Sequence, residues 1–98
     1  MIHWTKQGSN RLRQCRDHIA RESCDWFTAW RWEDAVLASV EHLVEFPDSG
    51  SIVRELNRDD IRQVVVGDYR VIYRVKRKTP EIISVRHCRF QISSIHSL

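Results

Sequence analysis

Hydrophobic residues in the first half of the chain recur at helical spacing after a short apolar start. Residues 2–4 read as a brief strand, and Thr5 can cap a following helix through its hydroxyl group. Apolar side chains at Leu12, Cys15 and Ile19 then recur three or four residues apart, which is the period of an amphipathic helix. The pattern predicts a first helix over residues 6–22.

A second, longer apolar stripe follows Asp25, which is a good helix-capping residue. The stripe runs to about residue 45 and is expected to bring Trp26 and Trp30 into the core, whereas Phe27 and Trp32 fall off it and should be exposed. Residues 46–50 contain proline and glycine and end the helix. The short link between the two helices predicts an antiparallel helical hairpin.

Beyond residue 50 the pattern changes to alternation. Residues 61–66, 69–76 and 82–88 read as strands joined by two close turns, which is typical of an antiparallel meander, and a weaker strand is expected near residues 52–55. One strand, two helices and a meander predict an α+β fold. We expect a twisted antiparallel sheet with the helical hairpin packed on one face, in a single domain over residues 1–98.

The sheet face turned away from the helices is expected to mix arginine with isoleucine. Alternation along the strands places on it Arg70, Ile72, Arg74, Ile82 and Arg86. Two interpretations stay open, namely a docking surface for a partner or a face covered by residues 90–98. Docking is preferred, because arginine beside exposed isoleucine is typical of interfaces.

Composition and charge limit the range of functions that the chain can have. The net charge is +3, and arginine supplies 13 of the 16 basic residues, which suits specific contact with carboxylates or phosphates. The three cysteines are an odd number without zinc-like spacing, so we expect a reducing cytoplasm, no metal and no cofactor. Neither a signal peptide nor a transmembrane segment is indicated, and no membrane contact is expected.

Several sequence segments resemble those of RelE/ParE-type toxins. Residues 62–74 read RQVVVGDYRVIYR and resemble the R-E-x-x-x-G-x-Y-R-x-x-Y core of that superfamily. Residues 43–50 resemble its L-x-x-F-P-x-x-G turn, residues 54–56 the segment after that turn, and residues 84–89 its V-x-H-x-R ending. Trp4 and Thr5 resemble the end of its first strand. The likeness spans nearly the whole chain in the right order and is closest to the ParE branch.

This resemblance implies a toxin of a type II toxin–antitoxin system, a class tied to plasmid stabilisation and growth inhibition. A cognate antitoxin would neutralise it, and DNA would be contacted only through the antitoxin complex. ParE-like members block DNA gyrase, whereas RelE-like members cut mRNA on the ribosome. A third alternative is a detoxified member that acts as a binding module or co-repressor with its antitoxin.

The residues themselves favour an inhibitor over a nuclease. Cutting RNA requires a base, a cation and an acid. Arg70 matches the family arginine, and in a nuclease His87 and Arg89 would be its partners. The lysines typical of the nuclease branch are replaced by Ile61 and Gln63, so no catalytic residue is assigned. Arg70 stays open between a structural anchor and an anion contact.

The expected binding residues follow from the arginine–isoleucine face and the hairpin. An acidic, amphipathic partner segment would complement that face. The residues expected to bind antitoxin or target are Arg70, Ile72, Arg74, Ile82, Arg86 and Arg89. On the hairpin, Phe27 and Trp32 are further candidate target contacts.

Overall fold

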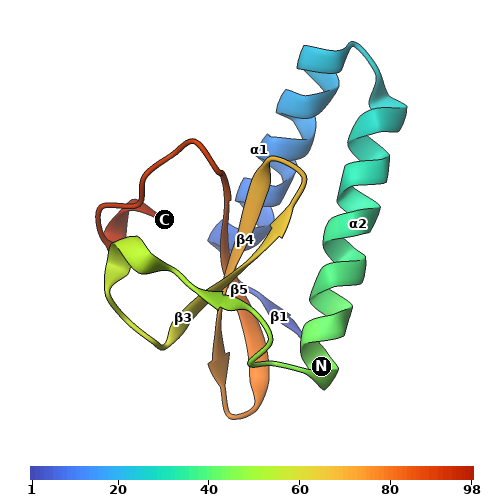
Figure 1. Ribbon diagram of the computed structural model, residues 1–98. Helices are drawn as coiled ribbons and strands as arrows, with labels where there is room; N and C mark the ends of the chain where they lie inside the picture. Colours follow the sequence, from blue (N-terminus) through green and yellow to red (C-terminus); the bar gives the residue numbers. More distant parts are fainter.

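The computed structural model describes residues 1–98, except for the side chain of Ser97. It begins with β1 (His3–Trp4), α1 (Lys6–Ser23) and α2 (Trp26–Glu45). There follow β2 (Ser51–Ile52), the 3-10 helix η1 (Arg54–Leu56), β3 (Ile61–Val66), β4 (Tyr69–Lys76), β5 (Thr79–His87) and the 3-10 helix η2 (Ile95–Ser97). The two helices form a hairpin that covers one face of the sheet, which confirms the α+β fold (Figure 1).

Both helices begin where capping side chains were expected. The Thr5 hydroxyl oxygen accepts a hydrogen bond from the Gly8 N–H at 3.0 Å and also donates to the Ile82 carbonyl of β5 at 3.0 Å. Asp25 accepts from the Phe27 N–H at 3.0 Å. These bonds satisfy N–H groups that the first turn of a helix leaves unpaired. Thr5 therefore also fixes the start of α1 against the sheet.

The sheet has five strands in the order β1-β5-β4-β3-β2. β3, β4 and β5 form the expected antiparallel meander, but β1 pairs with β5 in parallel, so the sheet is mixed rather than wholly antiparallel. The turn between β4 and β5 uses only Arg77 and Lys78, both at positive φ as in a type I′ turn, and β5 begins earlier than predicted. The strand expected at 52–55 ends at Ile52, where η1 soon takes over.

The main core lies between the hairpin and the sheet. It joins α2 residues to β4 residues that share one face, and its buried members include Val36, Val40, Leu43, Val71 and Tyr73. Tyr73 is fully buried, and its hydroxyl accepts from the Gly50 N–H at 2.9 Å and donates to the Pro47 carbonyl at 2.8 Å. The ring thereby holds the turn after α2 against the sheet.

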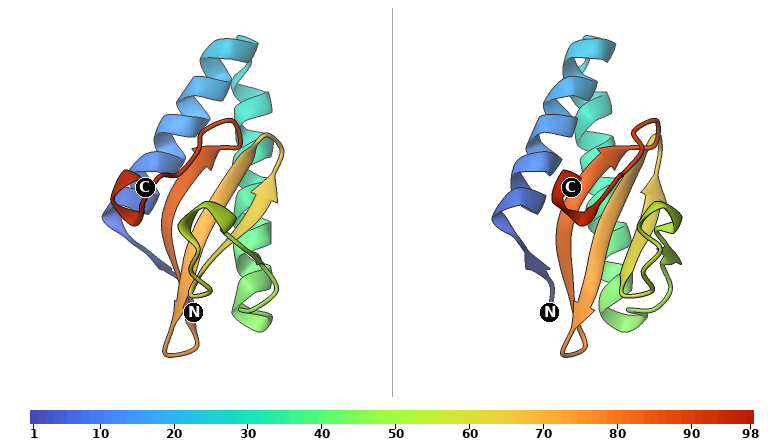
Figure 2. Two further views of the ribbon diagram at one scale, coloured as in Figure 1. Left: turned by 60° about the vertical axis from the view of Figure 1, so that its left-hand side comes forward. Right: turned by 90° about the vertical axis from the view of Figure 1, so that its left-hand side faces the viewer.

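A second core lies on the opposite face of the sheet, where the C-terminal segment and η1 pack (Figure 2). Ile72 is fully buried there against Val53, Ile61, Ile92 and Leu98. The exposed docking face expected around Ile72 is therefore wrong, and the alternative interpretation, cover by residues 90–98, is confirmed. Burying these apolar side chains is worth roughly 2 kcal/mol each, which is enough to hold the segment in place.

Ile82 does not lie on the same face as Ile72. A register shift next to Ile72 and Tyr73 pairs Ile82 with Tyr73 and Ser84 with Ile72. One extra residue in β5 reverses the alternation, so that Ile82 enters the main core and Ile83 packs towards the second core. The prediction that Ile82 belongs to an exposed face is wrong for this reason.

The described helices contain no segment long and apolar enough to span a membrane.

Candidate functional site

Arg70 lies at the centre of a charged cluster under the C-terminal segment. Its guanidinium binds the Glu55 carboxylate through two hydrogen bonds, Nη1 to Oε1 at 3.1 Å and Nη2 to Oε2 at 2.6 Å. Nη1 also donates to Gln63 Oε1 at 3.2 Å, and Nη2 donates to the Phe90 carbonyl. The Ile92 N–H donates to Glu55 Oε2 at 3.3 Å. Arg70 and Glu55 thus tie η1, β3 and the C-terminal segment together.

The electrostatics of this cluster follow from its hydrogen bonds. The Arg70 side chain is 7% exposed, and the hydrogen bonds from Arg70 lower the pKa of Glu55 from 4.5 to about 2. A guanidinium held in this way by a carboxylate of its own chain has little capacity left for a phosphate. Of the two roles left open for Arg70, these contacts support that of a structural anchor for the C-terminal segment.

Arg74 and His87 make contacts that are separate from those of Arg70. Arg74 donates from Nε to Glu81 Oε1 at 2.6 Å. His87 accepts the Arg89 N–H at Nδ1, at 3.0 Å, and its ring stands 5.0 Å from that of Tyr69. Arg89 itself is exposed. The three residues that a nuclease would need, Arg70, His87 and Arg89, therefore do not form one open cluster.

Arg86 lies in a groove between α1 and the end of β5. β1 pairs with β5 only at Glu81 and Ile82, so the second half of β5 has no neighbouring strand on that side. The hollow there has a volume of about 450 Å³ and is called the α1–β5 groove below. Its lining combines basic and aromatic side chains from three segments of the chain: Arg11, His18, Tyr69, Arg86, Arg89 and Phe90.

Positive charge gathers in the α1–β5 groove. Burial, and after it the charges of Arg11 and Arg70, lowers the pKa of Arg86, whose guanidinium carbon lies 5.0 Å from the centre of the Phe90 ring. Cys15 lies against the groove floor and donates to the Val85 carbonyl at 3.6 Å, and its burial raises the pKa of the thiol to about 11. The groove is thus an apolar hollow with arginines around it.

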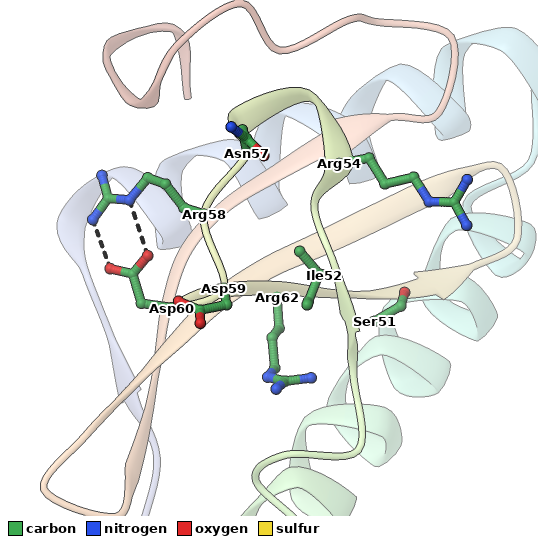
Figure 3. Close-up of a pocket in the computed structure, with 8 residues that line it drawn as sticks. All are labelled: Ser51, Ile52, Arg54, Asn57, Arg58, Asp59, Asp60 and Arg62. Carbon is green, nitrogen blue, oxygen red and sulfur yellow. Dashed lines mark hydrogen bonds and ion pairs between the residues drawn. The ribbon is translucent and has the colours of Figure 1, made fainter.

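A second hollow of about 1040 Å³ lies along β2, η1 and the start of β3. In Figure 3, Arg58 turns towards Asp60 and Arg54 points away from that pair. Arg58 binds Asp60 through bonds of 2.9 and 2.6 Å, which lower the pKa of Asp60. Arg62 donates to the Gly50 carbonyl at 2.8 Å. Because much of its charge is paired internally, this hollow is a weaker candidate for an anionic partner.

The hairpin presents aromatic side chains, but not those that were expected. Trp26 is 56% exposed, Phe27 63% and Trp30 59%, near the end of the hairpin that extends beyond the sheet (Figure 1). Trp32 is half-buried, with Nε1 donating to the Val66 carbonyl at 3.2 Å and its ring 5.1 Å from Tyr69. The expected core positions of Trp26 and Trp30 and the expected exposure of Trp32 are wrong, whereas that of Phe27 is confirmed.

Sequence reasoning missed three residues of these sites. Glu55, Arg11 and Phe90 were assigned no role. Arg11 could have been found, because positions 11, 15 and 18 fall on one side of a helix and carry Arg11, Cys15 and His18. Glu55 and Phe90 meet Arg70 and Arg86 only through the tertiary fold, and no local pattern signals them. Among the described side chains, no group of three His, Cys, Asp or Glu residues could hold a metal ion.

Comparison with known proteins assigns the family. Residues 2–92 match the family described as "ParE toxin of type II toxin-antitoxin system, parDE". The chain belongs to the ParE toxin family. A solved structure, "Chromosomal ParDE TA system from P. aeruginosa", is similar to this ParE-family chain with a TM-score of 0.70 and 18% identity, over 88% of this chain and 92% of that one. At that identity the similarity supports the fold alone. No curated protein matches the sequence.

Proposed function

We propose that this ParE-family chain inhibits DNA gyrase without cutting RNA, and that a cognate antitoxin neutralises it. Membership of the family implies an antitoxin partner. Gyrase as the target follows from the ParE branch of the resemblance. The observation that carries the choice against a nuclease is the state of Arg70.

A ribonuclease must hold the charge that develops on the phosphate, and preorganised donors do this best. In this chain the guanidinium of Arg70 is 7% exposed and bound to Glu55. Ile61 and Gln63 occupy the strand positions where nuclease relatives carry lysines, and the Gln63 side chain accepts from Arg70. His87 uses Nδ1 to accept the Arg89 N–H, which ties that nitrogen to the backbone. These contacts support a protein that acts by binding.

The exposed aromatic residues of the hairpin supply a surface for the target. Trp26, Phe27 and Trp30 lie together at the start of α2, and the Arg31 guanidinium lies 5.8 Å from the centre of the Phe27 ring. Tryptophan and arginine are the residues most often found to dominate binding energy in interfaces. We assign this surface to contact with gyrase.

The experiment compares gyrase activity with mRNA integrity. The purified chain is added to gyrase and relaxed plasmid, and the supercoiled product is measured on gels. In parallel, transcripts are mapped in cells that express the chain alone. We expect lost supercoiling and intact transcripts. Transcripts cut within codons, together with unchanged supercoiling, contradict the proposal.

A matched pair of variants tests the hairpin surface. Trp30→Ala removes an exposed indole, and its loss should raise the concentration needed for half-inhibition about tenfold, as for a central interface residue. Phe46→Ala is the control, because Phe46 is an aromatic residue of similar exposure (50%, against 59% for Trp30) at the other end of α2. Equal effects of the two variants would place the gyrase contact elsewhere.

A further inference from the structure

The turn between β4 and β5 carries three consecutive cations, Lys76, Arg77 and Lys78. The two strands stay paired up to Lys76 and Thr79, so the turn itself consists of Arg77 and Lys78 alone. In all three views the orange tip of this hairpin extends beyond the end of α2 and beyond the N-terminus (Figure 1, Figure 2). The three charges are thus held at the end of a paired two-stranded ribbon that projects from the molecule.

The charges at this turn are not balanced by carboxylates of the chain. The three side chains are exposed, and none of them belongs to an ion pair within the described residues. Glu81, the acidic residue that follows on β5, is 12% exposed and already accepts from Arg74 at 2.6 Å. The hollow beside the turn has a volume of about 390 Å³ and is lined by His3, Lys76, Arg77, Thr79 and Glu81. An anion that binds at the turn therefore displaces no internal partner of the three cations.

The backbone of the turn is unfavourable for the residues that occupy it. Arg77 has a φ of 52° and Lys78 a φ of 64°, in the left-handed region that a type I′ turn requires at both central positions. Asparagine and glycine adopt this conformation at little cost, whereas a long side chain there is strained. A turn that only joined two strands would be more stable with Asn-Gly. Strain of this kind concentrates at functional sites, which indicates a use for the two charged side chains.

We propose that the β4–β5 turn binds the phosphate backbone of duplex DNA through Lys76, Arg77 and Lys78. Lysine is a compact point charge that suits a phosphate, and two of the three lysines of the chain lie here. The major groove of DNA is about 12 Å wide and admits a two-stranded β-ribbon, so the tip can reach the phosphates along its edges. The inference goes beyond the proposed function, which requires contact with gyrase only. It also differs from the expectation that DNA is contacted only through the antitoxin complex.

Duplex DNA fits this turn better than an acidic protein or duplex RNA does. Protein interfaces bury an apolar centre. The tip offers none, because Pro80 is fully buried and Val75 is half-buried within the hairpin. Duplex RNA has a deep and narrow major groove, which a β-ribbon cannot enter. A projecting ribbon with charges but no apolar anchor therefore matches the regular phosphates of DNA.

Fluorescence anisotropy of a short labelled DNA duplex, titrated with the full chain, tests the proposal. At low salt the dissociation constant should be on the order of 10 µM, as for sequence-independent contact with a few phosphates. Three neutralised phosphates should give the logarithm of the binding constant a slope of about −2.7 against the logarithm of salt concentration. Duplex RNA of the same length and polyglutamate should bind at least about fivefold more weakly.

Two variants separate the charge of the turn from its backbone strain. Arg77→Asn/Lys78→Gly introduces the preferred type I′ sequence, so it should raise the thermal midpoint by about 5 °C while it weakens DNA binding about tenfold. Arg77→Gln/Lys78→Gln removes the same charges but keeps the strain. It should weaken DNA binding equally and change the midpoint by less than about 2 °C. Because the first variant is expected to be more stable than the wild type, its loss of binding cannot come from misfolding.

The control is Arg13→Gln/Arg21→Gln, which removes two charges from exposed residues of α1, outside the turn. It should change DNA affinity less than about threefold, since the net charge falls by the same amount but no phosphate contact is lost. The proposal is overturned by absence of DNA binding, by equal losses in the control and the turn variants, or by RNA or polyglutamate that binds as tightly as DNA. A first variant with a midpoint no higher than the wild type also contradicts it. These measurements contain no gyrase, so a failure of gyrase inhibition refutes the proposed function alone.

Discussion

Replacing Glu55 with glutamine removes the carboxylate that neutralises Arg70 while keeping the shape of the side chain. Glutamine has one acceptor oxygen where the carboxylate has two, so one of the two hydrogen bonds from Arg70, of 3.1 and 2.6 Å, is lost and the other loses its anionic acceptor. The Ile92 N–H also loses an anionic acceptor. The Arg70 side chain is 7% exposed, so its charge stays in a poorly solvated position without a counter-ion. The variant should therefore be less stable, and its C-terminal segment should loosen.

The lowered pKa of Glu55 gives the magnitude of the expected loss of stability. A pKa lowered from 4.5 to about 2 corresponds to about 3 kcal/mol of folding free energy at neutral pH. The Glu55 side chain is 26% exposed, and solvent screening reduces this to about 2 kcal/mol. Because the folded pKa lies below the unfolded one, this stabilisation is complete above pH 4.5 and is lost as the pH falls towards 2.

Urea unfolding followed by tryptophan fluorescence measures the effect. Glu55→Gln should lower the free energy of unfolding by about 2 kcal/mol at pH 7 and by about 1 kcal/mol at pH 3, because at pH 3 Glu55 of the unfolded wild-type chain binds a proton that the folded chain does not. Glu41→Gln, which changes an exposed acid on α2, should cost less than about 0.5 kcal/mol at either pH. Amide hydrogen exchange at Ile92 and Leu98 should be faster in Glu55→Gln only. A loss that is the same at both pH values would refute the assigned role of the Glu55 charge.

Three further predictions concern the core and the thiols. Gly50→Ala should destabilise the chain by about 2 kcal/mol in urea, since its Cβ would lie 2.7 Å from Tyr73 Cε1 and 2.8 Å from the Gln63 carbonyl oxygen; an unchanged midpoint would contradict this packing. Tyr73→Phe should cost about 1 to 3 kcal/mol by leaving the Gly50 N–H and the Pro47 carbonyl unpaired, and a thermal midpoint equal to the wild type would argue against those bonds. With iodoacetamide at pH 8, Cys15 should react at least about tenfold more slowly than the exposed Cys24, because the pKa of Cys15 is raised to about 11; mass spectrometry of the alkylated peptides decides the order.

The helices and the meander could be predicted because their signals are local. Thr5 and Asp25 accept bonds from N–H groups two or three residues away, and any chain with these caps before an apolar stripe starts a helix in the same way. The face shared by Tyr69, Val71 and Tyr73 follows from strand alternation, and all three are buried against the hairpin. Such features can be predicted without knowing which distant residues pack against them.

The orientation of α2 could not be predicted, because this helix carries two apolar stripes. Trp26, Trp30, Leu37 and Val44 form one stripe, which is exposed, and the buried stripe of Ala29, Val36, Val40 and Leu43 lies beside it. Periodicity identifies both stripes equally well. Only the packing of α2 on β3 and β5 decides which of them is covered.

The candidate sites could be predicted only in part, because their contacts join segments that are distant in the sequence. Arg70 was recognised as a key residue, but its partner Glu55 is 15 residues away and reaches it through η1. The bulge in β5 moved Ile82 to the other face, and the sequence carries no glycine there to signal it. Arg86 and Arg89 were identified as binding candidates, whereas their neighbour Arg11 was missed, although it shares one side of α1 with Cys15 and His18.

The parallel pairing of β1 with β5 has a consequence for synthesis of the chain on the ribosome. His3 and Trp4 are among the first residues made, and their partners Glu81 and Ile82 come near the end. Until those residues emerge, Thr5 has no Ile82 carbonyl to bind, and the apolar side of the helices has no complete sheet to cover it. Contacts over such long sequence separations form late and slowly. A polypeptide interrupted before residue 79 would therefore be an unfinished fold, with its apolar surfaces open to proteases.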